Sequence, residues 1–92
     1  MTLHDLEAIV RDRRSSPAES SYTARLLADP ELQQRKIMEE AFEVCLELQR
    51  TPSSPQRTAE EAADLLYHLV VGLVANDVAV DDVFAVLEGR RR

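Results

Sequence analysis

Two long segments, residues 30–50 and 56–75, carry apolar residues at helical spacing and are separated by a short linker rich in proline and serine. In the first segment no glycine or proline follows Pro30, and its apolar stripe contains Ile37, Ala41, Val44, Cys45 and Leu48. Helices joined by so short a connection pack side by side and antiparallel. The two segments therefore predict a helical hairpin, which limits the chain to folds built around such a pair.

Three shorter helices are expected outside this hairpin. Thr2 and Asp5 form a capping box that starts a helix ending near Arg14, residues 20–29 suit a short helix, and a last helix starts at Asp81. We expect the last helix to bury Val83, Phe84, Val86 and Leu87. The chain has 92 residues, which predicts one all-α domain over 1–92, a bundle of four to five helices. A chain this short buries little core, so we expect homodimerisation to complete the bundle.

Charge and cysteine content narrow the class of protein. The net charge is −6, which argues against a nucleic-acid or anionic-membrane partner. Cys45 is the only cysteine, and we expect it to pack in the core of a protein kept in a reducing compartment. No targeting segment is evident, and the longest apolar run, residues 69–75, is too short to cross a bilayer. A cytoplasmic protein is the expectation.

Each long segment carries a pair of acids three residues apart, Glu40 with Glu43 and Glu61 with Asp64. That spacing places both acids of a pair on one helix face, beside the apolar stripe. If the stripes pack together, the four carboxylates converge, and a hard cation such as Mg²⁺, or Mn²⁺ in its place, would neutralise them. The alternative is that the glutamates form a solvated helix face. Asp64 argues against it, since aspartate is a poor helix former and an apolar run follows, where an unpaired charge is costly.

Two further side chains lie on the acid stripes. Lys36 precedes Glu40 by one turn, and is either a surface ion pair or a group that neutralises phosphate charge. His68 follows Asp64 by one turn, and is either a hydrogen-bonded interior histidine or a ligand.

These residues also carry a family resemblance. The string from Lys36 to Glu43 followed by the string from Glu61 to His68 resembles the Glu-Glu-x-x-Glu and Glu-x-x-Asp signature of the all-α nucleotide pyrophosphohydrolases, the MazG-like superfamily. The segment Ser21-Tyr22-Thr23-Ala24-Arg25-Leu26-Leu27 is similar to one in its phosphoribosyl-ATP pyrophosphohydrolase family. Met38, where that family has glycine, and the absence of a glycine near Asp29 are departures from the pattern.

The resemblance implies Mg²⁺-dependent hydrolysis of the α–β phosphoanhydride of phosphoribosyl-ATP, giving phosphoribosyl-AMP and pyrophosphate in histidine biosynthesis. It also implies a set of roles. Glu39 would hold or activate the attacking water and Lys36 would contact phosphate. The expected metal ligands are Glu40, Glu43, Glu61 and Asp64. The expected substrate-binding residues are Ser21, Tyr22, Thr23, Arg25 and His68.

Two other functions remain open from the sequence. One is a housekeeping nucleoside triphosphate pyrophosphohydrolase of the MazG-like superfamily, against which the segment beginning at Ser21 argues. The other is a non-catalytic helical dimerisation module whose glutamates face solvent. Pyrophosphate release from different nucleotides separates the three functions.

Overall fold

The computed structural model describes residues 1–91 and contains helices, turns and loops but no strand in that part of the chain, which confirms the all-α fold class. A short 3-10 helix, Ala18–Ser20, precedes α2. The α-helices are α1 (Leu3–Asp12), α2 (Tyr22–Leu27), α3 (Pro30–Gln49), α4 (Pro55–Ala75) and α5 (Val80–Gly89).

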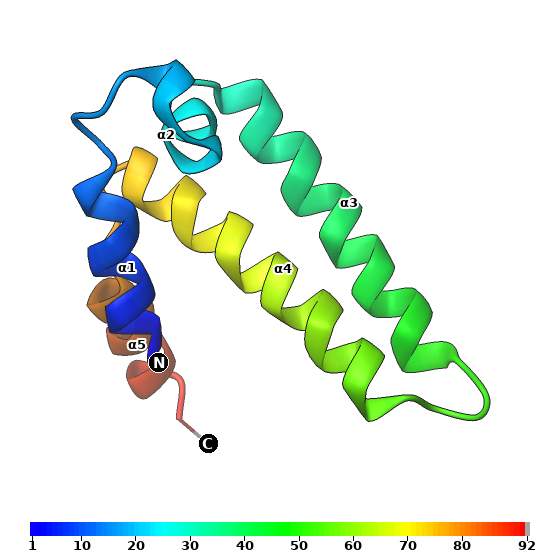
Figure 1. The fold of residues 1–92 in the computed structure, drawn as a ribbon. Coiled ribbons are helices and arrows are strands. Elements are labelled where there is room, and N and C mark those ends of the chain that lie inside the picture. Colours follow the sequence, from blue (N-terminus) through cyan, green and yellow to red (C-terminus); the bar gives the residue numbers. More distant parts are fainter. Residues whose placement is uncertain (92) are drawn as a thin grey trace.

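The predicted hairpin is formed by α3 and α4, which run antiparallel and side by side (Figure 1). Each helix begins with a polar N-cap followed by proline at the first helical position. Asp29 accepts a hydrogen bond from the backbone N–H of Leu32 at 3.1 Å, and Ser54 accepts one from that of Arg57 at 3.3 Å. These caps fix where both helices start, so the residues between Gln49 and Pro55 form the connecting loop.

The apolar core lies at the end of the hairpin remote from this loop. There α1 and α2 pack against the C-terminal half of α4 and the start of α3 (Figure 1). Gln33, buried in the same region, donates a hydrogen bond to the carbonyl oxygen of Leu26 at 2.7 Å and so satisfies the C-terminal end of α2. Among residues 1–91, no helix has the length and apolar character needed to cross a membrane. The core residues are Val10, Leu26, Leu32, Val70, Val71 and Val74.

Apolar side chains of the last helix, and Cys45 on α3, are exposed although they were expected to be buried. Only Val80 of α5 is buried, because that helix contacts the rest of the chain mainly through α1. Cys45 is exposed as well, so its predicted place in the core is wrong for a single chain. The exposed side chains of α5 are Val83, Phe84, Val86 and Leu87.

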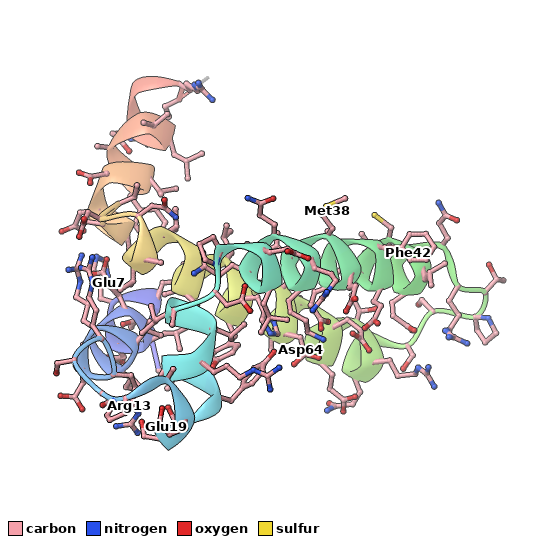
Figure 2. The ribbon with its side chains drawn as sticks, turned by 90° about the horizontal axis from the view of Figure 1, so that it is seen from above. Glu7, Arg13, Glu19, Met38, Phe42 and Asp64 are labelled. Atoms are coloured by element: carbon pink, nitrogen blue, oxygen red, sulfur yellow. The ribbon has the colours of Figure 1, made fainter. Side chains whose placement is uncertain are left out.

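One side of α3, its outer face, consists of Met38, Phe42, Cys45 and Leu46, all exposed. Figure 2 shows Met38 and Phe42 on α3 and Asp64 on the neighbouring α4. At helical spacing these residues lie on the side of α3 opposite the buried Glu40. The apolar pattern of α3 therefore continues onto a surface that its own chain does not cover.

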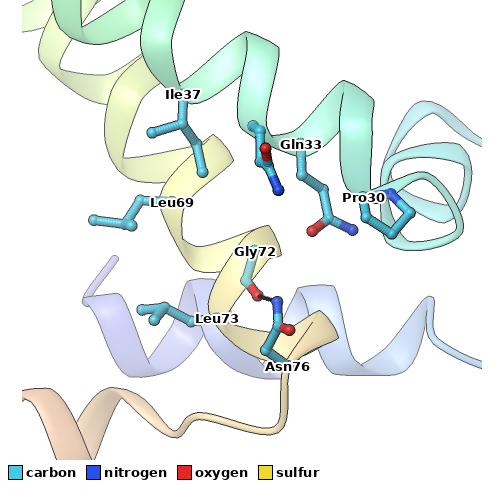
Figure 3. A pocket seen from close by; sticks show the side chains of 8 residues that line it. Pro30, Gln33, Ile37, Leu69, Gly72, Leu73 and Asn76 are labelled. Carbon is cyan, nitrogen blue, oxygen red and sulfur yellow. Dashed lines mark hydrogen bonds between the residues drawn. The ribbon is translucent and has the colours of Figure 1, made fainter.

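A groove of about 210 Å³ between α3 and α4 lies near the core end of the hairpin (Figure 3). Gly72 forms part of its floor, and a Cβ added there would lie 3.4 Å from Cδ1 of Ile37, an ordinary van der Waals distance. The groove is lined by Pro30, Gln33, Gln34, Ile37, Leu69, Gly72, Leu73 and Asn76.

Candidate metal centre

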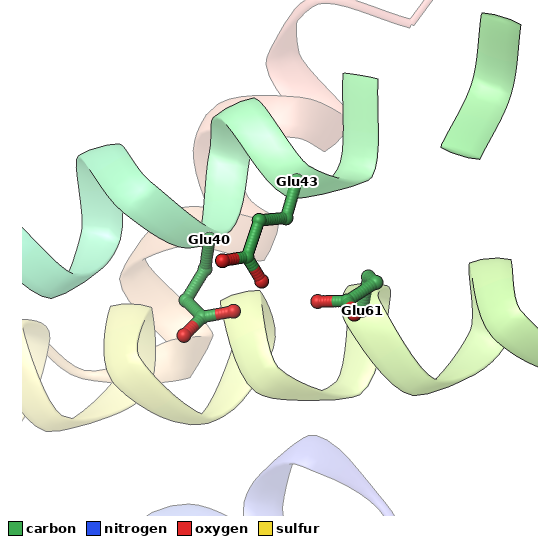
Figure 4. A group of neighbouring side chains, drawn as sticks. All are labelled: Glu40, Glu43 and Glu61. Carbon is green, nitrogen blue, oxygen red and sulfur yellow. The ribbon is translucent and has the colours of Figure 1, made fainter. Parts of the chain in front are cut away.

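Three of the predicted acids converge between the two long helices. Glu40 and Glu43, one turn apart on α3, face Glu61 on α4, and one oxygen from each lies within 4.8 Å of the others (Figure 4). The antiparallel packing of α3 and α4 brings them together, since each acid lies on the face that its helix turns to the other. We call these three residues the acid cluster.

The acid cluster is partly removed from water without being neutralised. Glu40 is only 7% exposed and Glu61 is half-buried. Oε2 of Glu40 and Oε2 of Glu61 are buried and have no hydrogen-bond partner among the described residues. Buried charged oxygens without a partner are strongly destabilising unless a cation or proton compensates them. The donor set is all carboxylate oxygen, which fits Mg²⁺ or Mn²⁺ better than metals that prefer nitrogen or sulfur.

The proton affinities of the cluster follow from this crowding. Burial raises the pKa of Glu40, and the negative charges of Glu43 and Asp64 raise it further. The pKa of Glu61 rises to about 7, chiefly because its carboxyl group can share a hydrogen bond with that of Glu43, and then because of burial and the neighbouring charges. At neutral pH the cluster therefore favours either a bound proton or a bound cation.

Asp64 lies one turn after Glu61 but is exposed and does not belong to the three-oxygen cluster. The sequence suggested that an unpaired charge at this position would be costly, but Asp64 is exposed, so burial alone does not require a partner for it. Its charge still raises the pKa of both Glu40 and Glu61, which places it near the site. Its role as a ligand stays a prediction.

Lys36 and Glu39 pair with each other on α3. The Nζ atom of Lys36 lies 3.2 Å from Oε2 of Glu39, so the lysine pairs with Glu39 and not with Glu40 one turn further on. This hydrogen bond, with the negative charge of Glu39, raises the pKa of Lys36. Both side chains are accessible to a ligand, but neither assigned role is tested by this arrangement.

A polar network connects α2 to α4 beside Asp64. The hydroxyl of Tyr22 and Nε2 of His68 are 3.0 Å apart, and Nδ1 of His68 is 2.8 Å from the backbone carbonyl oxygen of Asp64. Because a carbonyl only accepts, Nδ1 carries the proton, and in the neutral ring Nε2 accepts from Tyr22. Thr23 and Tyr67 hydrogen-bond through their hydroxyls at 2.5 Å. His68 is therefore a buried, hydrogen-bonded interior histidine, one of the two roles that the sequence allowed for it.

The other two predicted substrate-binding residues are Ser21, just before α2, and Arg25 on α2. Ser21 caps that helix by accepting a hydrogen bond from the backbone N–H of Ala24 at 3.0 Å, so it has a structural task. Arg25 is exposed. Contact of these residues with substrate stays a prediction.

Glu47 is a buried acid for which the sequence patterns predicted no specific role. Its side chain is 6% exposed and contacts Arg50 and Arg57, on either side of the connecting loop. The signal was present in the sequence, since an acid near the end of one helix and a base in the first turn of the next flank a short linker.

The fold and the site together define a class: an all-helical chain whose central hairpin holds a carboxylate cluster suited to a divalent cation. Residues 3–91 match the family model described as phosphoribosyl-ATP pyrophosphohydrolase. The chain belongs to this family.

The names of similar proteins are consistent with this family. A protein of a Ruegeria species named phosphoribosyl-ATP pyrophosphatase is 42% identical over 97% of this chain and 84% of its own length. One of the same name from Cereibacter sphaeroides is 47% identical over 96% of this chain and 84% of its own. A histidine biosynthesis trifunctional protein of Neurospora crassa is 42% identical over 96% of this chain, which spans 10% of it.

Proposed function

We propose that this protein hydrolyses the α–β phosphoanhydride of phosphoribosyl-ATP, giving phosphoribosyl-AMP and pyrophosphate, as a step of histidine biosynthesis that requires Mg²⁺. Family membership and the names of the relatives support the reaction. The observation that carries the metal requirement is the convergence of Glu40, Glu43 and Glu61 with two buried, unpartnered oxygens. In this proposal those three acids hold Mg²⁺, and Asp64 completes the set from the same face of α4.

The chain's own residues would then divide the remaining tasks. When bound, the metal polarises phosphoryl oxygens and lowers the pKa of bound water. Glu39, exposed beside the cluster, accepts the proton of the attacking water. Lys36, whose ammonium group is partly accessible, lies against phosphate oxygens and offsets the charge that develops on them. Tyr22, Thr23 and Arg25 on α2 face the phosphoribosyl end, with His68 holding Tyr22 in place.

Pyrophosphate release tests the proposal. Purified protein with Mg²⁺ should release pyrophosphate from phosphoribosyl-ATP much faster than from ATP or dUTP, and chelation of the metal should stop the reaction. Equal rates with all three nucleotides would favour the housekeeping pyrophosphohydrolase. No release from any of them would favour the dimerisation module.

We also propose that the protein acts as a homodimer in the cytoplasm. The exposed apolar face of α3 and the exposed apolar side chains of α5 support a second copy as the missing partner. A further groove of about 180 Å³ between α4 and α5 is lined by apolar residues, among them Leu66, Leu69 and Phe84. The single, exposed and unpaired Cys45 suits a reducing compartment.

A further inference from the structure

The loop end of the hairpin holds an ion cluster that the proposed reaction does not use. Glu47 is 5% exposed. Its Oε1 accepts a hydrogen bond from Nε of Arg50 at 2.9 Å, and its Oε2 accepts one from Nη2 of the same arginine at 3.1 Å. Nε of Arg57 lies 3.4 Å from Oε1 of Glu47. We call Glu47, Arg50 and Arg57 the loop-end cluster.

The two arginines of this cluster differ in what they connect. Arg50 is the C-cap residue of α3, so its pair with Glu47 stays on one side of the loop. Arg57 belongs to the first turns of α4, so its contact with Glu47 joins the two helices. The carboxylate of Glu47 is buried, whereas the side chains of Arg50 and Arg57 are 44% and 59% exposed. A contact of this kind adds little to the free energy of unfolding, but it restricts how the two helices lie against each other.

The loop-end cluster lies directly beside the acid cluster. Glu43 precedes Glu47 by one turn on α3, and Glu61 follows Arg57 by one turn on α4. The contact between Glu47 and Arg57 therefore fixes the same two helix faces that present Glu43 and Glu61 to each other.

Little else holds this end of the hairpin together within one chain. In residues 34–67, all of which the structure describes, only Glu40 and Glu47 are buried. Apolar side chains on the facing surfaces, such as Val44 and Leu65, are half-buried, and the core lies at the opposite end. Meanwhile the carboxylates of the acid cluster repel one another across the gap between the helices.

We infer that Glu47 and Arg57 are positioning residues for the metal site: their cross-helix ion pair holds α3 and α4 at the separation at which Glu40, Glu43 and Glu61 bind one divalent cation. This inference rests on the proposed metal site. Without the ion pair, repulsion among the acids separates the helices at this end and the site loses its preformed geometry.

Mn²⁺ binding, monitored by the electron paramagnetic resonance signal of the free ion, tests the inference without a measurement of turnover. Arg57→Gln is compared with Arg35→Gln, which removes the same charge from a surface pair within α3, where Arg35 lies 4.0 Å from Glu31. Loss of a positive charge alone should tighten Mn²⁺ binding in both variants. The inference predicts instead that Arg57→Gln binds Mn²⁺ about tenfold more weakly than Arg35→Gln. A loss of this size is typical for changes in residues that orient metal ligands.

A second pair of variants keeps the test decisive if Arg57→Gln fails to fold. Glu47→Gln preserves the shape of the side chain, and Glu31→Gln removes the same charge from an exposed position. Glu47→Gln also removes a negative charge one turn from Glu43, so it supports the inference only if it binds Mn²⁺ about tenfold more weakly than Glu31→Gln. The double variant of Glu47 and Arg57 should bind no more weakly than the worse single variant, since both changes break one contact.

Several outcomes would overturn the inference. Mn²⁺ affinity in Arg57→Gln equal to or tighter than in Arg35→Gln, with Glu47→Gln equal to Glu31→Gln, would do so. A lower melting temperature of Arg57→Gln with unchanged Mn²⁺ affinity would assign the pair to fold stability alone. Failure of the unaltered protein to bind Mn²⁺ would remove the metal site itself, a result distinct from any difference between variants.

Discussion

Glu40 is a buried carboxylate whose pKa is raised by burial and by the charges of Glu43 and Asp64. A side chain in that position lowers the stability of the metal-free protein, and a functional site is the usual reason for such a cost. We predict that Glu40→Gln reduces Mg²⁺-dependent pyrophosphate release by at least about a hundredfold, the upper end of the loss seen for residues that merely support metal ligands. The melting temperature should stay equal or rise, because the substitution removes like-charge repulsion.

Steady-state kinetics and thermal denaturation of the same sample measure both effects. Glu31→Gln, at an exposed position of the same helix, is the matched control and should change neither. A large loss of stability in Glu40→Gln would show that the carboxylate supports the fold, and would contradict its assignment as a ligand.

Glu61 gives a prediction about pH. Its pKa is 4.5 in the unfolded reference and about 7 in the folded protein. Between these values the folded protein retains a proton that the unfolded chain has released, so the free energy of unfolding falls as pH rises through this window. We expect the melting temperature of the metal-free protein to decline from pH 4.5 to about 7. Saturating Mg²⁺ should reduce that decline, because the cation then replaces the proton.

Thermal denaturation across this pH range, with chelator and with Mg²⁺, measures the effect. Glu61→Gln does not titrate and should flatten the dependence in the metal-free protein. A slope identical in the unaltered protein and in Glu61→Gln would assign the pH dependence to other groups.

At the scale of elements, Gly72 is the only glycine within α4, which continues through it without a break. A Cβ there would meet Cδ1 of Ile37 at an ordinary contact distance of 3.4 Å, and alanine favours a helix interior by about 0.8–1.0 kcal/mol over glycine. We predict that Gly72→Ala raises the free energy of unfolding, measured by urea denaturation, by up to about 1 kcal/mol. Gly89→Ala, at the last residue of α5, should gain less. Destabilisation by Gly72→Ala would show that the contact of the added Cβ with Ile37 costs more than the gain in helix propensity.

The elements themselves were predictable because their start signals are local. Thr2, Ser21, Asp29 and Ser54 cap four of the helices, and each acts through residues close to it in the sequence. The convergence of Glu40, Glu43 and Glu61 was predictable for a similar reason, since helical spacing and one short linker determine it.

Burial of individual side chains was harder to predict, because it depends on what covers each helix. Asp64 is exposed and Glu47 is buried, although the sequence around them suggests the reverse. The expected burial of the apolar stripe of α5 and of Cys45 on α3 is wrong for a single chain, because spacing identifies an apolar stripe but does not say which element, if any, covers it. Phe42 and Phe84 are consequently 65% and 43% exposed.

For the whole molecule, charge and apolar surface are arranged on different sides of α3. Glu40 and Glu47 face α4, whereas Phe42 and its neighbours on the outer face point away from it. A second copy could therefore cover the apolar face without burying the acid cluster under another set of carboxylates. Association through this face would also press α3 against α4 from outside, adding to the few contacts that join them near the loop.

Substitution of Phe42 tests this arrangement. We predict that the unaltered protein sediments as a dimer and that Phe42→Glu sediments as a monomer, because a charge at the centre of an apolar interface cannot be solvated there. Leu48→Glu is the control: it changes a residue of the same helix that is 68% exposed, against 65% for Phe42, and lies about 120° away around the helix axis. Sedimentation velocity at several concentrations measures the mass of each variant. A monomeric unaltered protein, or dissociation by Leu48→Glu alone, would exclude the outer face of α3 as the dimer interface.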